Sequence, residues 1–227
     1  MEENLGKLNI ALDGPAGAGK SSVARAIAKK LKILYLDTGA MYRAVGYDIL
    51  RKGIDPLNKD KVENEMKDIL VKVLFVDGEQ RILLKEEDVT TKIRTPEISK
   101  AASDVSAHSA VRLAMVELQR RTAKEYDMIL DGRDIGTFVL PDSKNKFYLT
   151  ASSNQRAHRR FLEYNQRGIK KSKQEIKEEI EKRDFNDMNR SLAPLKQADD
   201  AVLIDSTELT LKEVVEEILS HINFEEN

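Results

Sequence analysis

A glycine-rich stretch over residues 14–21 constrains the fold more than any other part of the chain. It reads Gly14-Pro15-Ala16-Gly17-Ala18-Gly19-Lys20-Ser21 and fits the pattern G-x-x-x-x-G-K-[ST]. An apolar segment at 8–12 precedes it, and an alanine-rich helical pattern follows it to about residue 32. A strand, such a loop and a helix in this order predict an α/β unit that binds phosphate through backbone N–H groups and the positive end of the helix.

The last two residues of this loop indicate that the chain binds a nucleoside triphosphate, with Mg²⁺ as cofactor. A lysine at the position of Lys20 reaches the β and γ phosphates, and the Ser21 hydroxyl is suited to Mg²⁺. The Asn-Lys-x-Asp pattern that a GTPase uses to read its base does not occur in the sequence, and a motor ATPase usually has a longer chain with further domains. The sequence therefore favours a small ATP-dependent kinase.

The charge balance excludes a chain that binds long polyanions over its whole surface. The 38 Lys and Arg residues nearly cancel the 39 Asp and Glu residues, for a formal net charge of -1. We therefore expect no nucleic-acid or membrane partner, and any anion must be bound locally. The chain has no cysteine, its three histidines are far apart in the sequence, and residues 1–8 lack the apolar stretch of a secretory signal. These features predict a cytoplasmic protein without a zinc site, and nothing in the sequence indicates more than a monomer.

Short apolar segments alternate with longer helical patterns along most of the chain. This alternation predicts a parallel sheet covered by helices on both faces. The expected further strands are 33–36, 128–130, 146–150 and 201–204, and the expected further helices are 39–50, 62–70, 106–123, 152–165, 173–189 and 209–222. Two strand-like runs, 71–76 and 81–84, flank Asp-Gly-Glu-Gln and predict a β-hairpin that interrupts the α/β pattern.

Three polar clusters directly follow predicted strands, at 14–21, 37–43 and 131–137. Because ligands of open α/β sheets bind outside the carboxyl ends of the strands, these clusters should converge at one edge of the sheet. Asp13 and Asp131 end two of these strands and could hold a water bound to Mg²⁺. An equally good interpretation is that these carboxylates cap nearby backbone.

The helical pattern at 173–189 and the residue after it carry the most informative charges. Arg183, Asp187 and Arg190 share one arc of about 80° around the helix axis. The same arc also holds Ile176 and Ile180. Charges on an inward stripe are costly unless they are paired, so this end of the helix should face a cleft. The alternative is a surface pair between Arg183 and Asp187, which would contribute only about 0.3–0.5 kcal/mol.

Further arginines could belong to the same cleft. Arg43 and Arg133 lie just after predicted strands, and one helix face carries Arg156, Arg159 and Arg160. A solvated helix surface would also account for Arg43 and for the three arginines of that face, and a turn stabilised by an Asp-Gly pair would account for Arg133. The guanidinium fork grips phosphate oxygens in pairs, and an acceptor that is itself a phosphate needs no general base. Two other functions stay open: a kinase of the shikimate or nucleoside type, with a hydroxyl acceptor and Asp13 as base, and a regulatory nucleotide-binding protein.

Five segments together resemble bacterial cytidylate kinases. They are 14–22, Asp-Thr-Gly-Ala-Met-Tyr-Arg at 37–43, Ile-Arg-Thr-Pro-Glu at 93–97, Asp-Gly-Arg-Asp-Ile-Gly-Thr at 131–137, and the charged stretch 183–190. The resemblance implies a five-stranded parallel P-loop core that transfers the γ-phosphoryl group of ATP to CMP or dCMP with Mg²⁺. It also implies three parts: a core over 1–37, 106–155 and 191–227, a monophosphate-binding insert with a small antiparallel sheet over 38–105, and a helical lid over 156–190.

The same resemblance implies roles for individual residues. The acceptor phosphate would be held by Arg43, Arg133 and Arg190, and the sugar by Arg183 and Asp187. The base would be held by Ser103, Arg112 and Asp134, in a pocket also lined by Thr38, Tyr42 and Gly132. ATP would contact the loop from Gly14 to Ser22, together with Arg156 and Arg160. Lys20, Arg133, Arg183 and Arg190 would stabilise the transferred charge. The proline that the family often carries before Arg112 is absent.

Overall fold

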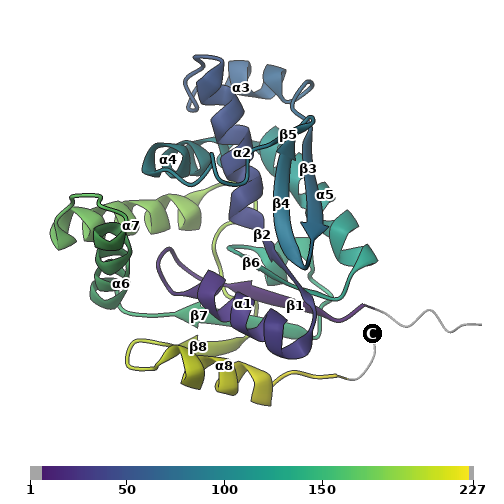
Figure 1. The fold of residues 1–227 in the computed structure, drawn as a ribbon, viewed down its shortest axis with the longest axis vertical. Helices are drawn as coiled ribbons and strands as arrows, with labels where there is room; N and C mark the ends of the chain where they lie inside the picture. The colour runs from purple at the N-terminus through teal and green to yellow at the C-terminus, as the bar shows by residue number, and fades with distance from the viewer. Residues whose placement is uncertain (1–6, 225–227) are drawn as a thin grey trace, which may run out of the picture.

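Five parallel strands form the central sheet of the computed structural model, which describes residues 7–224 (Figure 1). They are β1 (Asn9–Asp13), β2 (Leu34–Asp37), β6 (Met128–Gly132), β7 (Asn145–Thr150) and β8 (Val202–Asp205). Their order in the sheet is β2-β6-β1-β7-β8, and every neighbouring pair is parallel. The predicted α/β fold is therefore confirmed. Residues 1–6 and 225–227, which include the outer parts of the predicted core segments and most of the segment 1–8, lie outside the described residues.

Helices cover both faces of this sheet, as the alternation of buried side chains requires. Ile10 and Leu12 face α1 (Lys20–Leu31) and α8 (Leu211–Ser220) in one apolar cluster. Ala11 belongs to the cluster on the other face. The helices there are α2 (Thr38–Arg51) and α5 (Ser109–Glu125). Strands β1, β2 and β6 thus contribute to two separate apolar layers, whereas β7 and β8 contribute only to the layer of α1 and α8.

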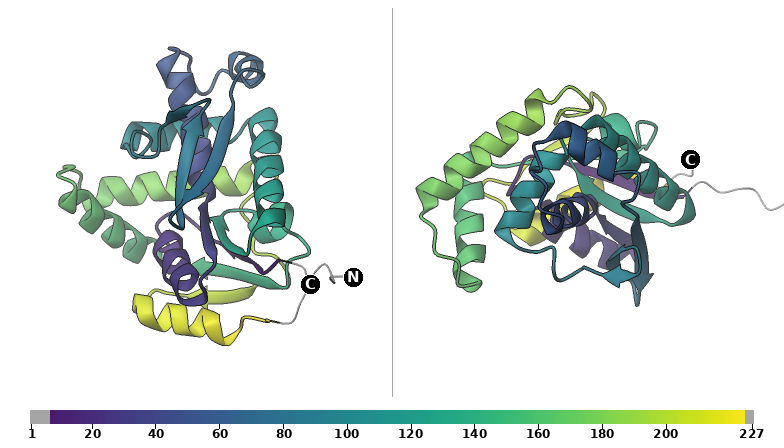
Figure 2. Two further views of the ribbon diagram at one scale, coloured as in Figure 1. Left: turned by 45° about the vertical axis from the view of Figure 1, so that its right-hand side comes forward. Right: turned by 90° about the horizontal axis from the view of Figure 1, so that it is seen from above.

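A three-stranded antiparallel sheet lies alongside α2 and reaches down toward β2 (Figures 1 and 2). It consists of β3 (Val71–Val76), β4 (Glu79–Leu84) and the short β5 (Glu87–Asp88). The predicted hairpin is confirmed, but its turn is tighter than expected. Asp77 and Gly78 form the turn with φ of 52° and 78°, so Glu79 and Gln80 already belong to β4. The third strand was not predicted, because two residues carry too little pattern.

Two helices of this region differ from the prediction. The expected helix 62–70 is α3 (Lys59–Glu65), which begins earlier because the Asn58 side chain caps Lys61 N–H. The unexpected α4 (Pro96–Val105) is started by Thr95, whose hydroxyl accepts from Ile98 N–H, with a proline at the first position. The packing of α4 on α2 needs Gly46, because a Cβ there would lie 2.9 Å from the backbone nitrogen of Ala102.

A helical pair projects from the carboxyl side of the sheet on the left of Figure 1. It consists of α6 (Ser153–Gln166) and α7 (Lys173–Asn189), in good agreement with the predicted ranges. Ile176 and Ile180 of α7 pack with Ala157 and Tyr164 of α6 against Ala16 of the glycine-rich loop. A π-helical turn, η1 (Ile135–Val139), follows β6 and was not predicted. Within 7–224, no helix combines the length and apolar character needed to cross a membrane.

The buried layer between β1 and α1 provides a test of the fold. Leu12→Ala removes a fully buried side chain and should lower the free energy of unfolding by about 2–5 kcal/mol, with the urea m-value unchanged. Leu203→Ala changes the same residue type on β8, where the side chain is 56 % exposed, and should shift it by less than about 0.5 kcal/mol. Equal losses in urea titrations of the two variants would contradict this packing.

Candidate active site

The three polar clusters that follow β1, β2 and β6 meet at the carboxyl edge of the central sheet. These strands are neighbours, so their ends lie side by side. Thr38 Oγ1 donates to the carbonyl oxygen of Asp131 at 2.7 Å, and Ser21 Oγ donates to the Asp131 carboxylate at 2.7 Å. The Asp13 carboxylate accepts from Ile135 N–H at 2.8 Å. The predicted convergence is therefore confirmed.

The glycine-rich loop wraps around Lys20. Gly14 has φ of 147°, and a Cβ there would lie 2.0 Å from the carbonyl oxygen of Leu149, so only glycine fits. Lys20 is 6 % exposed, and its Nζ donates to the carbonyl oxygens of Gly14 and Pro15 at 2.7 and 2.8 Å. Burial and the charge of Arg133 lower the pKa of Lys20 well below its usual value, against the opposing effect of Asp131. A cation in this position is ready to exchange carbonyl oxygens for phosphate oxygens.

An ion pair between α6 and α7 holds the glycine-rich loop in place. Ala16 N–H donates to the Asp184 carboxylate at 2.9 Å, and the Ala16 carbonyl oxygen accepts from Arg156 Nη1 at 2.9 Å. Arg156 also pairs with Asp184 and donates to the carbonyl oxygen of Ala151. Both charged side chains are buried. Direct contact of Arg156 with ATP stays a prediction, whereas its bonds to the loop indicate a positioning role.

Sequence reasoning gave no role to Asp184, although it adjoins Arg183 in a charged stretch. It also missed Ser206, which directly follows β8, a place where a polar residue can reach the same sheet edge. Arg159 Nη1 donates to Ser206 Oγ at 3.0 Å and to the carbonyl oxygen of Ala18 at 3.1 Å. Arg160 differs from these anchors, because it pairs with Glu163 and lies over the Tyr164 ring with its guanidinium carbon 4.7 Å from the centroid.

Asp131 and Asp13 have different surroundings, which separates their possible roles. Burial, then the charge of Asp37, raises the pKa of Asp131 to about 6. Burial raises the pKa of Asp13 to about 7, although its carboxylate accepts from the N–H groups of Ile135 and Gly136. Asp13 therefore caps the π-helical turn. The Ser21 hydroxyl and the Asp131 carboxylate are hard oxygen ligands next to the loop, a donor set that fits Mg²⁺.

Two carboxylates gather the arginines on the other side of Lys20. Asp187 accepts from Arg133 Nε at 2.9 Å and lies 3.6 Å from Arg190 Nη1 and 4.0 Å from Arg183 Nε. Burial would raise the pKa of Asp187, but the three arginines hold it below its usual value. The prediction that this end of α7 faces inward is confirmed.

The second carboxylate, Asp134, accepts from Arg112 at 2.5 Å and from Arg190 Nη2 at 3.2 Å. Arg112 is 1 % exposed and lies over Tyr42, with its guanidinium carbon 5.7 Å from the ring centroid. Burial raises the pKa of Tyr42 to about 12 and keeps its phenol neutral. Of the three residues predicted to hold the base, Arg112 and Asp134 are thus in contact with each other, and Asp134 also contacts Arg190.

The cluster carries more buried guanidinium N–H groups than it has partners for. Burial, then the charge of Arg133, lowers the pKa of Arg183 to about 10. Within the described residues, the buried Nε atoms of Arg43, Arg112 and Arg183 have no hydrogen-bond partner. Unpaired buried donors are costly, and three of them in one positively charged region fit an anionic ligand.

Arg43 is fixed by Asp37, which ends β2 and caps α2. Asp37 accepts from Ala40 N–H at 2.9 Å and from Arg43 Nη2 at 2.7 Å. It also accepts from Arg94 Nη1 at 3.0 Å. Burial raises the pKa of Asp37, but Arg43 and Arg94 hold it below its usual value. Arg94 belongs to the Ile-Arg-Thr-Pro-Glu motif, to which sequence analysis assigned no role.

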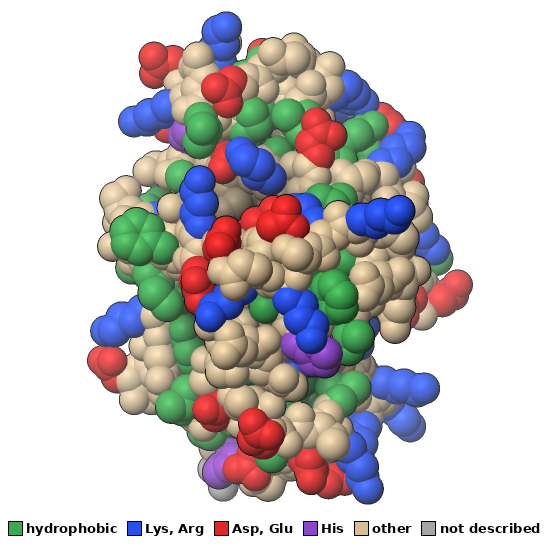
Figure 3. All heavy atoms as spheres, turned by 90° about the vertical axis from the view of Figure 1, so that its left-hand side faces the viewer, with side chains coloured by type: hydrophobic (Ala, Val, Ile, Leu, Met, Phe, Trp, Pro, Cys, Tyr) green, Lys and Arg blue, Asp and Glu red, His purple; other side chains and the backbone are tan. Residues whose placement is uncertain are grey.

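Ser103 lies with Asp187 and Arg190 in a small cavity of about 240 Å³ between α4 and α7. Gly132 allows Ile135 to pack closely beside the site, because a Cβ at position 132 would lie 2.6 Å from Ile135 Cδ1. Charged side chains of both signs gather across the middle of the face in Figure 3. A larger groove of about 520 Å³ lies on the outer side of α5, but it contains none of the predicted site residues.

Comparisons with known proteins agree with this geometry. The family model described as Cytidylate kinase matches residues 10–224. A relative from Caldicellulosiruptor saccharolyticus, called "Cytidylate kinase", is 48 % identical over 213 residues, or 94 % of each chain. Another of that name, from Halalkalibacterium halodurans, is 44 % identical over 95 % of this chain and 97 % of its own.

One solved structure adds a likeness of fold alone. It is an uncharacterized protein from Eubacterium ventriosum ATCC 27560, with a TM-score of 0.51 and 11 % identity over 95 % of this chain and 98 % of that one. The family model and the relatives span nearly the whole length, including the glycine-rich loop and the arginine cluster. On this evidence of sequence and site together, the chain belongs to the cytidylate kinase family.

Proposed function

We propose that the protein transfers the γ-phosphoryl group of ATP to CMP and dCMP. The observation that carries the proposal is a network of charged side chains at the carboxyl edge of the central sheet, which has two unlike halves. One half is the glycine-rich loop around Lys20, and the other is the group of arginines held by Asp187, Asp134 and Asp37. A loop that binds one polyphosphate needs no second set of arginines unless another anion is held opposite it.

The donor half provides backbone N–H groups from the loop and the cation of Lys20 for the phosphates of ATP. We propose that Gly14 to Ser22 hold the phosphates and that Arg160 lies beside the nucleotide. Ser21, with Asp131 behind it, would hold Mg²⁺. When bound there, Mg²⁺ would neutralise negative charge on the phosphates of ATP. Arg156 then supports ATP binding by fixing Ala16.

The acceptor half neutralises the phosphate that receives the group. We propose that Arg43, Arg133 and Arg190 hold this phosphate and that Arg183 and Asp187 hold the sugar. Two anions brought end to end repel each other, and guanidinium groups fixed beforehand by carboxylates remove that repulsion without reorganisation. No general base is required, because the acceptor oxygen is already ionised near neutral pH.

The base would bind between Asp134, Arg112 and Ser103, in a pocket lined by Thr38, Tyr42 and Gly132. Cytosine offers an amine donor and a ring nitrogen acceptor, so a carboxylate and a guanidinium match it. Uracil presents a carbonyl and an N–H at the same places. The mismatch leaves buried groups unpaired, which is the strongest source of discrimination between similar substrates.

We also propose that the segment 38–105 is the acceptor-binding insert, that 156–190 is the lid, and that the remainder is the core. Arg167, at the end of α6, donates to the backbone carbonyl oxygen of Arg94 in the insert. This bond joins the two segments across the cleft, as a lid that excludes water requires. A hydroxyl acceptor is less well supported, because Asp13, its expected base, is occupied by two backbone N–H groups.

An acceptor panel tests the proposal. With ATP and Mg²⁺, kcat/KM for CMP and dCMP should exceed that for UMP, AMP, GMP and dTMP by at least about 100-fold, approaching about 10⁴-fold if no water bridges the mismatch. Release of ADP measured at several acceptor concentrations gives these values. Equal turnover of AMP or dTMP would contradict the assignment of the base pocket.

Arg183→Ala tests the acceptor half. A lost charge-assisted hydrogen bond should lower kcat/KM for CMP by about 10- to 100-fold, while the Kd of ATP measured by calorimetry changes less than about twofold. Lys182→Ala is the matched control, since Lys182 precedes it on α7 with an exposed side chain. If Arg183→Ala left acceptor kinetics unaltered, the proposed role of the inward stripe would be wrong.

Asp184→Asn tests the opposite half from the next residue of the same helix. Asparagine retains an acceptor for Ala16 N–H but weakens the pair with Arg156, so the loop should be held less firmly. KM for ATP should rise by about 3- to 10-fold, with KM for CMP nearly unchanged. A larger change in the acceptor KM than in the ATP KM would refute this separation along α7.

A further inference from the structure

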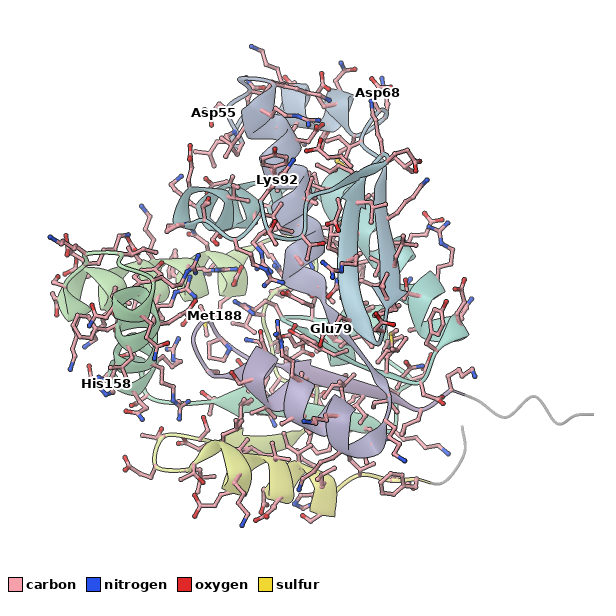
Figure 4. All side chains as sticks on the ribbon, viewed as in Figure 1. Asp55, Asp68, Glu79, Lys92, His158 and Met188 are labelled. Carbon is pink, nitrogen blue, oxygen red and sulfur yellow. The ribbon has the colours of Figure 1, made fainter. Side chains whose placement is uncertain are left out.

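Gln80 occupies the end of the small sheet that points to the core. Residues 80, 82 and 84 of β4 alternate onto one face, and Ile82 and Leu84 are buried there. Gln80 is half-buried at the same face, next to the turn that starts the strand. Figure 4 labels Glu79 beside it, at the end of β4 nearest α1. A polar side chain on an apolar face, directed toward the core, requires a specific partner.

That partner is the backbone of Asp37. The Gln80 amide oxygen accepts from Asp37 N–H at 2.8 Å, and the amide nitrogen donates to the Asp37 carbonyl oxygen at 3.3 Å. Strand β2 forms one edge of the central sheet, so the main-chain groups of its last residue that face away from β6 have no neighbouring strand. The side-chain amide takes the place of a peptide group from such a strand.

The residue held in this way organises part of the acceptor site. The Asp37 carboxylate caps α2 through Ala40 N–H and pairs with both Arg43 and Arg94. Its side chain is 7 % exposed. The position of the Asp37 backbone therefore sets where two guanidinium groups lie, one from α2 and one from the segment before α4. A displacement of a few tenths of an ångström at the end of β2 would be carried to both.

We propose that Gln80 is a positioning residue for the acceptor, which fixes Arg43 and Arg94 by bracing the Asp37 backbone from the small antiparallel sheet. The proposal rests on the proposed function in one respect, namely that Arg43 holds the acceptor phosphate. Gln80 is not placed in contact with substrate. The small sheet thereby contributes to catalysis through its tip, in addition to the apolar contacts of Ile82 and Leu84.

A purely structural role for Gln80 predicts that its substitution lowers stability, whereas a positioning role predicts a change in acceptor kinetics. The register of the small sheet is maintained by backbone pairing from Val71–Leu84 to Val76–Glu79, and its attachment by buried apolar side chains. Removal of one half-buried amide should therefore leave the sheet folded. The effect of a substitution should appear in acceptor kinetics and not in stability.

The test compares Gln80→Ala with Arg81→Ala in the full chain. Arg81 is the next residue on the opposite face of β4, and its side chain is 46 % exposed. Gln80→Ala should raise KM for CMP about 3- to 10-fold, with KM for ATP within about twofold and the thermal midpoint within a few degrees of the unsubstituted protein. Arg81→Ala should leave all three values unchanged. A similar rise in KM for ATP, or no rise in KM for CMP, would overturn the proposal.

A double-mutant cycle with Asp37→Asn identifies the route of the effect. Asparagine is an equally good helix cap, so α2 remains capped, but the pairs with Arg43 and Arg94 are weakened. If Gln80 acts through the Asp37 carboxylate, Gln80→Ala should add less than about twofold to KM for CMP in the Asp37→Asn background. Full additivity would also overturn the proposal.

The unsubstituted protein separates failure of this inference from failure of the proposed function. Turnover of CMP by that protein tests the function alone. If another nucleoside monophosphate proves to be the acceptor, the same ratios between variants are measured with it. They then test the role of the contact between Gln80 and Asp37 independently of the base that is bound.

Discussion

The close approach of several positive charges is the constraint on which the rest of the structure depends. After the larger effect of burial, the charge of Arg133 lowers the pKa values of both Lys20 and Arg183, so these cations would separate if nothing held them. Asp187 on α7 prevents this for Arg133 and Arg183, and Asp134 after β6 holds the neighbouring Arg190. The overall charge of -1 conceals this local concentration, which exists only because the fold brings distant segments to one sheet edge.

The two halves of the cleft are built by different means. In the proposed donor half, we expect main-chain groups to do most of the binding, and side chains such as Arg156 and Asp184 hold the loop through Ala16. In the acceptor half, side chains face the cleft and are themselves oriented by ion pairs. The first arrangement requires glycines at fixed places, as at Gly14, and the second requires elements that arrive from several directions. A parallel sheet with an inserted segment meets both requirements.

Much of this could be predicted from local pattern. The loop at 14–21 and the apolar strands around it define the core, and the period of α7 placed Arg183, Asp187 and Arg190 on an inward face. The shortest elements, β5 and η1, were missed because few residues carry their pattern, and α4 was missed although Thr95 and Pro96 mark its start. Bonds such as Gln80 to Asp37 and Ala16 to Asp184 span 43 and 168 residues between a side chain and a backbone group. No local periodicity specifies such a partner, so these bonds emerge only with the fold.

Helix α7 has a consequence for how the two nucleotides influence each other. Within one turn it presents Asp184 to the phosphate loop and Asp187 to the arginines of the opposite half. Because the helix has a contact in each half, it cannot rotate or slide at one contact without moving the other. If binding in one half shifts α7, the shift reaches the other half as well, and linkage then requires the resulting change of affinity to be equal in both directions.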